Sequence, residues 1–408
     1  MALTDAQVRI TDPAFYFGDP YETYQALRAQ SPVYWHEAAR CWVLTKYADI
    51  ETASKDAATF SVASGVLLTD ILKEHDFLSQ MYPEGSENVS TSDPPRHTQI
   101  RKLMNFAFAR SRIEAFEPTI RRLIGTCLDK FMETGKGEVV HDLSIPVTAD
   151  VVKAFIDCDD MKTEQVLQWS DDVFRMGSDL TMEEILETVE RIKPMFAYFL
   201  DKVEKRRANP KDDFIGHLIE AELDDKKLSS LMVESYLQTV MVAGNETTRN
   251  GFTASIKMLA EHPDQYDLLR QRPELASSAV EEILRYHSPV TGFVRTALTD
   301  TEIRGQKIAK GEHVYMLYGA ANRDPDVFVD PEKFDITRFV DTNKTHLAFG
   351  RGPHICIGMA LARLEMRILL EELIPRFTGF ELLGPPMRPN TLLGNGYAAL
   401  PTRFLRAH

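Results

Sequence analysis

A glycine-rich turn around one cysteine, near the C-terminal end of the chain, constrains the fold most strongly. The turn runs from His346 to Gly358 and reads HLAFGRGPHICIG. Apolar residues then recur at helical spacing from Met359 to Leu373. Cys356 is therefore predicted to lie on a tight turn before a helix, where unpaired N–H groups and the helix dipole favour the thiolate. A soft sulfur anion in that position is a metal ligand or a nucleophile.

The surroundings of Cys356 narrow this choice but leave a structural role open. No second cysteine or HExxH sequence lies nearby, so the spacing fits neither a zinc nor an iron–sulfur site. The glycines allow the backbone to pass close to a flat, bulky group, and Phe349 is placed to cover one side of it. The alternative is a buried structural cysteine in a glycine-rich turn. The other cysteines are scattered and indicate a reducing cytoplasm rather than a disulfide framework: Cys41, Cys127 and Cys158.

A second unusual segment lies within a long helical run, predicted from Leu228 to His262. Its middle reads AGNETT, from Ala243 to Thr248. Glycine inside a helix costs about 1 kcal/mol relative to alanine, and threonine loosens a helix by bonding back to an i−4 carbonyl. A small-residue notch followed by an acid and two hydroxyls suits a flat ligand pressed against the helix. Close helix–helix packing at Ala243 and Gly244 is the alternative.

Two further pairs of charged residues share a helical face. His97 and Arg101 are four positions apart on a helix that begins near Asp93, which is predicted to cap it. A histidine and a guanidinium together can grip carboxylates, although a solvated surface is the alternative. Glu282 and Arg285 form an E-x-x-R pair, for which Glu281 is a possible competitor.

Taken together, these segments resemble the cytochrome P-450 family. The cysteine turn fills the haem-loop pattern F-G-x-G-x-H-x-C-x-G, including Phe349 and Gly350, and AGNETT fills the pattern A-G-x-D/E-T-T. The resemblance implies that Cys356 is the axial thiolate of haem b and that Glu246 and Thr247 deliver protons during oxygen activation. It further implies two groups, namely residues that bind the haem propionates (His97, Arg101, Arg295 and His354) and a buried ion network (Glu282, Arg285 and Arg338).

The resemblance also implies a fold. We expect a mainly α cytochrome P-450 architecture, with one domain over residues 1–408 and a small β region from stretches near 30–45, 290–320 and 380–405. The haem is expected between the long central helix and the helix that follows Cys356. Residues 61–92 form a long, leucine-bearing stretch that is expected to shape the substrate pocket with Phe293, and the tail near 393–400 is expected to reach it.

Composition restricts the partners. A formal net charge of −14 argues against general nucleic-acid binding. The N-terminus shows no apolar segment, and no later stretch approaches a membrane span. Because membrane-bound members of the resembled family carry an N-terminal anchor, the resemblance then implies the soluble, bacterial-type group. We further expect a cytoplasmic enzyme that acts as a monomer. No flavin or dinucleotide motif is visible, so electrons are expected from a separate ferredoxin and ferredoxin reductase.

The function implied is that of a haem-thiolate monooxygenase. It would use O2 to hydroxylate a bulky, apolar small molecule such as a sterol, terpenoid or branched lipid. Two other classes remain open from the sequence. One is a peroxygenase, isomerase or dehydratase built on the same fold, and the other is a haem sensor without turnover, although a sensor has no need of the Glu246–Thr247 pair.

Overall fold

The computed structural model describes residues 3–18, 20–73, 87–176, 178 and 180–407. Its α-helices are α1 (Pro13–Phe17), α2 (Tyr21–Gln30), α3 (Tyr47–Lys55), α4 (Leu68–Leu72), α6 (Arg96–Met104), α7 (Arg110–Ala115), α8 (Glu117–Thr134), α9 (Ile145–Phe155), α10 (Thr163–Arg175), α11 (Met182–Ala208), α12 (Phe214–Glu220), α13 (Ser230–Glu261), α14 (Pro263–Gln271), α15 (Ala276–His287), α16 (Tyr318–Ala321) and α17 (Met359–Arg376). Shorter turns of other helix types are η1 (Val140–Ser144), η2 (Pro273–Leu275) and η3 (Gly352–His354).

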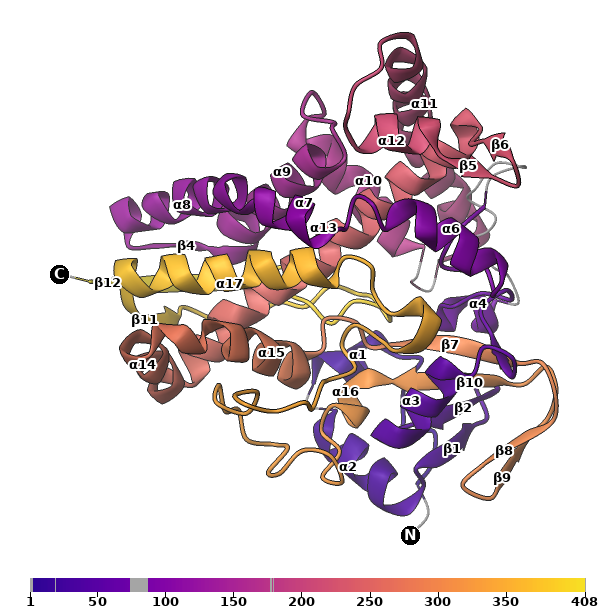
Figure 1. The fold of residues 1–408 in the computed structure, drawn as a ribbon. Coiled ribbons are helices and arrows are strands. Elements are labelled where there is room, and N and C mark those ends of the chain that lie inside the picture. Colours follow the sequence, from indigo (N-terminus) through magenta and orange to yellow (C-terminus); the bar gives the residue numbers. More distant parts are fainter. Residues whose placement is uncertain (1–2, 19, 74–86, 177, 179, 408) are drawn as a thin grey trace.

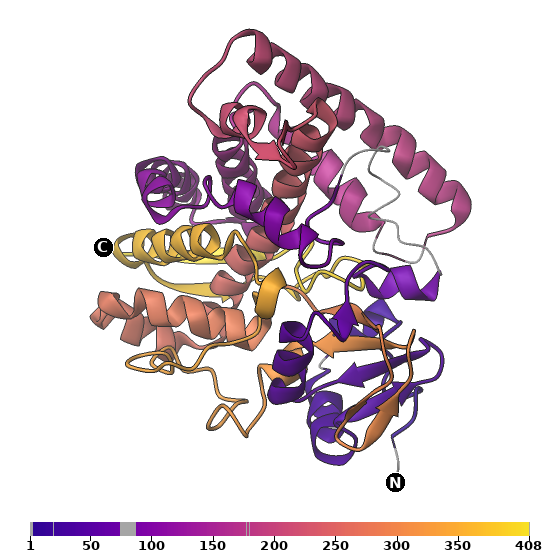
Figure 2. The same ribbon diagram turned by 45° about the vertical axis from the view of Figure 1, so that its right-hand side comes forward.

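The strands are short and lie mainly at the two ends of the chain. They are β1 (Val33–His36), β2 (Cys41–Leu44), β3 (Phe60–Ser61), β4 (Lys136–Glu138), β5 (Glu222–Leu223), β6 (Lys226–Lys227), β7 (Gly292–Ala297), β8 (Thr301–Ile303), β9 (Gln306–Ile308), β10 (His313–Leu317), β11 (Phe377–Leu382) and β12 (Pro401–Arg406). Helices fill most of the molecule, and a small sheet packed with α1–α3 occupies one corner (Figures 1 and 2). The predicted mainly α fold with a small β region is confirmed.

The main sheet joins chain segments that are far apart in sequence. Its strand order is β1-β2-β10-β7-β3. β1 and β2 form the predicted hairpin, with Trp35 opposite Trp42, and β10 runs parallel to β2. A second sheet, β11-β12-β4, includes a strand from the helical region that sequence patterning did not indicate. The predicted β-rich stretches near 30–45, 290–320 and 380–405 thus all contain strands.

The long central helix, α13, begins and ends close to the predicted limits. Ser229 caps it by accepting a hydrogen bond from the N–H of Met232. The helix runs without a break through Ala243–Thr248, so the glycine and threonines do not interrupt it. α13 crosses the interior of the molecule behind α17 (Figure 1). No helix of the described residues is long and apolar enough to cross a membrane.

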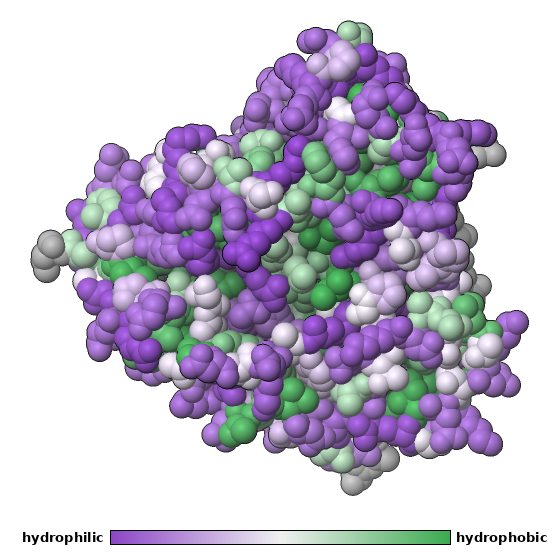
Figure 3. Space-filling model, in the orientation of Figure 1, coloured by the Kyte–Doolittle hydropathy of each residue, from purple (hydrophilic) through white to green (hydrophobic). Residues whose placement is uncertain are grey.

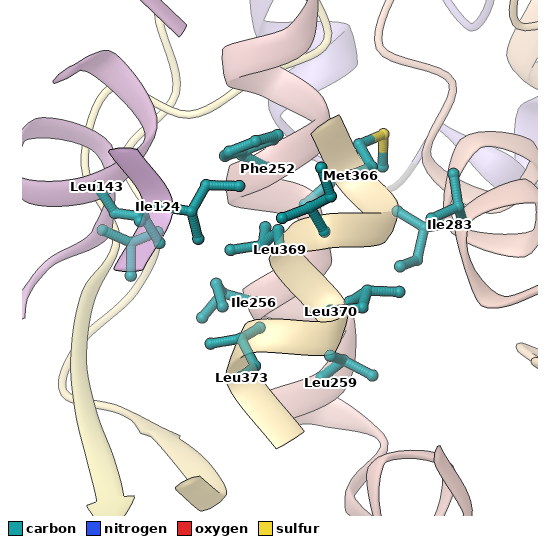
Figure 4. Packing of buried hydrophobic residues seen from close by; sticks show 14 of the residues in the cluster. Ile124, Leu143, Phe252, Ile256, Leu259, Ile283, Met366, Leu369, Leu370 and Leu373 are labelled. Atoms are coloured by element: carbon teal, nitrogen blue, oxygen red, sulfur yellow. The ribbon is translucent and has the colours of Figure 1, made fainter. Parts of the chain in front are cut away.

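The core beside the cysteine turn is built by α17 and α13. Figure 4 shows Met366, Leu369, Leu370 and Leu373 of α17 packed beside Phe252, Ile256 and Leu259 of α13, with Ile283 of α15 on one flank. Each of these is buried. Burial of one such side chain is worth roughly 1.5–3 kcal/mol, so this cluster holds the helix after Cys356 in a fixed position against α13.

The E-x-x-R pair forms the buried network that the resemblance implied. Arg285 and Glu282 are both fully buried, and the guanidinium donates two hydrogen bonds of 2.7 and 2.8 Å to the carboxylate. Arg338 donates to the same carboxylate at 3.1 Å. Glu281 does not compete, contrary to the sequence interpretation, because it accepts two hydrogen bonds from Arg363 instead.

The predicted capping role of Asp93 is wrong. Its carboxylate accepts hydrogen bonds from the hydroxyl of Ser61 and from the N–H of Val62, 3.0 Å away. Only the backbone carbonyl of Asp93 reaches α6, where it accepts from the N–H of His97 at 2.9 Å. The side chain thus ties β3 to the start of α6, a long-range contact that a local capping pattern does not reveal.

Candidate active site

A cavity of about 370 Å³ separates α13 from the cysteine turn and the start of α17. α6 and β7 also contribute to its wall, as does the segment from Asn88 to Ser90. Most of the lining is apolar. The face of the molecule drawn in Figure 3 is largely hydrophilic at its margins, with apolar residues gathered near its centre. The cavity therefore offers an apolar ligand a largely apolar wall.

The cysteine turn takes its shape from two glycines with positive φ. Gly350 has φ +68° and Gly352 has φ +70°, a region that other residues rarely adopt. A Cβ added to Gly352 would lie only 2.1 Å from the backbone oxygen of Ser54 at the end of α3. The turn closes when the N–H of Cys356 donates to the carbonyl of Phe349 at 2.9 Å. Glycine at position 352 is thus required both by backbone angle and by close contact.

Cys356 differs from the other cysteines because its side chain reaches the cavity. Cys41, Cys127 and Cys158 are buried, whereas Cys356 is exposed at the wall of the cavity, with protein packed closely around it. This enclosure raises the pKa of the Cys356 thiol, and the N–H groups of Gly358 and Met359 only partly oppose the effect. The N–H groups at the helix start thus act on the thiol in the expected direction, but in the protein without a metal burial outweighs them. A coordinated metal cation would deprotonate the thiol.

Four basic side chains meet at one edge of the cavity. These are His97, Arg101, Arg295 and His354, the residues expected at the haem propionates. The rings of His97 and His354 lie 4.0 Å apart. Burial, with the nearby guanidinium groups, lowers the pKa of His97 to about 4 and that of His354 to about 2. Both histidines are therefore neutral near pH 7.

The acidic counterpart of this cluster is weak in the part of the chain that is described, because Asp93 attracts His97 and Arg295 without forming an ion pair with either. None of the four side chains forms an ion pair there, and neither ring nitrogen of His97 has a hydrogen-bond partner. Buried donors and cations of this kind are ordinarily satisfied. A ligand with carboxylate groups would supply the missing partners.

A single cysteine at the cavity also fits a cofactor whose metal is already held by other ligands of the cofactor itself. The described residues contain no group of three His, Cys, Asp or Glu side chains able to hold a metal ion. A metal at Cys356 therefore needs further ligands from elsewhere. A porphyrin with two propionates supplies both those ligands and anions for the basic cluster, so the residues present fit haem.

Thr247 and Glu246 lie on different sides of α13. Thr247 lines the cavity, and its hydroxyl donates to the carbonyl of Ala243 at 2.7 Å. Glu246 is buried beside Arg249, with 3.6 Å between their charged atoms, and burial raises the pKa of its carboxyl to about 7. Arg249 in turn pairs with Asp171, which is about half exposed. A proton-holding group thus stands between the cavity-lining threonine and the surface.

Other predictions about the wall are partly met. Leu67 and Phe293 line the cavity, as does Leu393 from the tail, but Leu68 packs into a separate core cluster. Residues 74–86 of the long leucine-bearing stretch lie outside the described residues. Sequence reasoning missed Tyr318, which lines the cavity near Arg295. Tyr318 belongs to no recognisable motif, and it reaches the cavity because α16 begins directly after β10.

Comparisons with known proteins show which family the chain belongs to. The cytochrome P450 family model matches residues 24–398. Linalool 8-monooxygenase of Pseudomonas putida is 33% identical over 383 residues, which cover 92% of this chain and 93% of that protein. Steroid C26-monooxygenase of Mycobacterium tuberculosis is 31% identical over 411 residues, covering 98% of both.

Solved structures agree with these relatives. The structure of CYP108D1 from Novosphingobium aromaticivorans superposes with a TM-score of 0.88 at 30% identity and full coverage of both chains. P450BioI, solved in complex with an acyl carrier protein carrying hexadec-9Z-enoic acid, gives a TM-score of 0.84 at 31% identity, with 96% of this chain and 100% of that chain covered. The chain belongs to the cytochrome P450 family and is a monooxygenase of the bacterial type.

Removal of a guanidinium from the basic cluster is expected to weaken haem binding. Arg295→Leu and Arg101→Ala should each lower haem affinity by about a hundredfold to a few thousandfold, because loss of one partner from a buried charge pair typically costs about 3–5 kcal/mol. Haem content after dialysis against apomyoglobin measures this. Arg110→Ala, at a highly exposed position, is the control. Full haem retention in both cluster variants would contradict the assignment.

Proposed function

We propose that this protein hydroxylates a bulky, largely apolar small molecule, using haem b held by Cys356. The observation that carries the proposal is that the Cys356 sulfur and Thr247 line the same apolar cavity. When bound, the haem supplies the activation of O2 that inserts one oxygen atom into substrate and releases the other as water. The protein's own residues would bind the cofactor, orient the substrate and deliver protons.

The roles of these residues follow from their positions. Cys356 would ligate the iron, and Phe349 and Gly350 would shape the backbone beside it. His97, Arg101, Arg295 and His354 would hold the two propionates as hydrogen-bond donors and cations. Neutral histidines donate only one proton each, so Arg101 and Arg295 would carry most of the charge.

Proton delivery would pass from solvent toward Thr247. The Glu246 carboxyl has a pKa raised to about 7 by burial, so it both holds and releases a proton near neutral pH. Its partner Arg249 connects it with Asp171 at the surface. The Thr247 hydroxyl lies on the cavity side of the helix, where it would pass a hydrogen bond to the reacting oxygen.

The substrate class rests on the cavity wall and on two relatives. Apolar side chains come from several elements: Val66, Leu67, Val173, Phe174, Val290 and Phe293. Relatives named for linalool and for a steroid cover nearly the whole chain. A terpenoid, sterol or branched lipid fits both observations.

Electrons are expected to come from a ferredoxin and its reductase in the cytoplasm, with the enzyme acting as a monomer. Lys102, Arg110, Arg112 and Arg363 are candidate docking cations, but several are already paired. Arg110 binds Glu114, Arg112 lies 3.5 Å from Asp212, and Arg363 binds Glu281. Long-range attraction of an acidic partner by these residues would therefore be modest.

Incorporation of labelled oxygen tests the proposed activity. Purified holoenzyme with a surrogate ferredoxin, its reductase and NADPH is supplied with linalool, farnesol or cholest-4-en-3-one under 18O2. One labelled oxygen atom per product molecule is expected. Turnover with peroxide alone, or rearrangement without label, would favour the peroxygenase or isomerase class, and haem binding without turnover would favour a sensor.

Thr247→Ala is expected to uncouple electron flow from product formation. The variant should retain haem and substrate binding but convert at least about tenfold less of the NADPH consumed into product, because a positioned proton donor typically contributes about 10²-fold or more. The remainder should appear as hydrogen peroxide. Product per NADPH and peroxide are assayed together.

Ser255→Ala is the matched control for this variant. Ser255 makes the same type of i−4 hydrogen bond on α13, to the carbonyl of Gly251 at 2.8 Å, but is buried outside the cavity. It should leave coupling unchanged. A Thr247→Ala enzyme as tightly coupled as the parent would show that another group carries the proton.

A further inference from the structure

A buried amide of α13 lines the cavity without a hydrogen-bond partner. Gln238 is 1% exposed, and neither its side-chain oxygen nor its nitrogen is bonded to any described residue. An amide buried without a partner is costly, so such groups ordinarily meet a bound molecule or an ordered water. The proposed reaction gives Gln238 no task.

A second buried group lies one helical turn away. Glu234 is fully buried, and both of its carboxyl oxygens lack partners among the described residues. Burial raises the pKa of this carboxyl to about 8, so at neutral pH it is mainly the uncharged acid, which donates as well as accepts. Glu234 and Gln238 are four positions apart on α13, and residues with this spacing lie on the same face of a helix. The two side chains therefore share one face of α13, and we call this pair the polar position, of which Gln238 is the member that lines the cavity.

The cavity reaches Gln238 along α13. It touches the helix from Gln238 to Thr248, and Val173 and Phe174 of α10 also contribute to its wall. Asn88 and Ser90 line it as well. Gln238 precedes Thr247 by nine positions, which corresponds to about 13 Å along a helix that rises 1.5 Å per residue. The polar position thus lies well away from the place of oxidation.

We infer that Gln238 is a specificity-determining residue that binds a hydroxyl or carbonyl group of an elongated substrate, with Glu234 extending the same polar position. The inference rests on the proposed function and narrows its substrate class. The substrate is an amphiphile whose polar group lies on the order of 13 Å from the carbon that is oxidised. A compact hydrocarbon leaves the amide unpaired and is bound less tightly.

Matched ligands test the inference on the holoenzyme. Farnesol has an extended chain about as long as the required separation, and the hydrocarbon lacking only its terminal hydroxyl is the comparison. Dissociation constants are measured from the haem spectral shift. Farnesol is expected to bind about tenfold more tightly, because the hydrocarbon leaves a buried polar group unsatisfied. Its oxidation is expected at the end of the chain far from the hydroxyl.

Variants assign the preference to Gln238. Gln238→Leu, of similar volume, should bind the two ligands equally, mostly through weaker binding of farnesol. Met241→Leu, at a buried apolar position on the same helix that does not line the cavity, should keep the tenfold preference. Haem content and the carbon-monoxide spectrum confirm folding, and the comparison in the parent enzyme stands even where a variant does not fold.

The possible failures are distinguishable. Equal binding of both ligands by the parent enzyme overturns the inference and leaves an ordered water as the partner of Gln238, while the proposed function stands. A preference that persists in Gln238→Leu also overturns it. If neither ligand shifts the spectrum or is oxidised, the bulky apolar substrate class fails together with the inference.

Discussion

Cys356→Ser protein is expected to lose monooxygenase activity while retaining its fold. The sulfur is the only cysteine side chain of the four that reaches the cavity, and serine replaces one atom without disturbing the turn, whose N–H donates from the backbone. Changes to residues that merely support a metal ligand cost about 10–100-fold, so loss of the ligand itself should exceed about 100-fold in turnover.

Spectroscopy separates loss of ligation from loss of folding. The reduced carbon-monoxide complex of the parent should show the red-shifted Soret band of thiolate ligation, and the variant should not. Cys127→Ala removes a buried cysteine remote from the turn and should keep both the band and the activity. A Cys356→Ser enzyme with an unchanged band would remove the basis of the site assignment.

The second large effect concerns stability rather than chemistry. Glu282→Ala is expected to lower the free energy of unfolding by about 3–5 kcal/mol, because it leaves two guanidinium groups without their shared carboxylate. Arg285 is fully buried and also donates to the carbonyls of Asn322 and Pro331, so it has no route to water. Urea unfolding of the holoenzyme, followed by helical circular dichroism, measures the change.

An exposed ion pair gives the matched control. Arg403 and Glu381 pair across β11 and β12 with about half of each side chain exposed. Glu381→Ala should therefore change stability by less than about 1 kcal/mol. Equal effects of the two substitutions would show that the buried network does not brace the fold. We expect haem binding in Glu282→Ala to fail in parallel with unfolding, not before it.

Sequence patterns predicted several helices, strands and turns correctly, because these elements are determined by residues close together in the chain. The hairpin of β1 and β2, the limits of α13 and the turn before α17 all arise from local spacing and turn chemistry. The patterns were less successful where distant segments compete. Asp93 binds β3 in place of its own helix, and Glu281 binds Arg363 in place of Arg285.

The candidate site shows the same division. Motifs singled out Cys356, Thr247 and the basic cluster. They did not reveal that the pKa of the Cys356 thiol is raised, because the helix start is a local feature whereas burial depends on the whole fold. Gln238 and Tyr318 carry no motif, and their importance appears only when the cavity and its unpaired atoms are known. The proposed roles of the site residues, and the single domain over 1–408, remain predictions.

The contact between Gly352 and the end of α3 also bears on biosynthesis. The cysteine turn rests against Ser54, and strand β10 is inserted between β2 and β7. Segments near the N-terminus, which are synthesised first, therefore cannot complete these contacts until the later segments have been synthesised. Contacts between residues so far apart in sequence also form slowly. We expect the nascent chain to lack an assembled cofactor site until its final quarter leaves the ribosome. Haem acquisition would then be a post-translational event, and C-terminal truncation before Cys356 would yield protein without pigment.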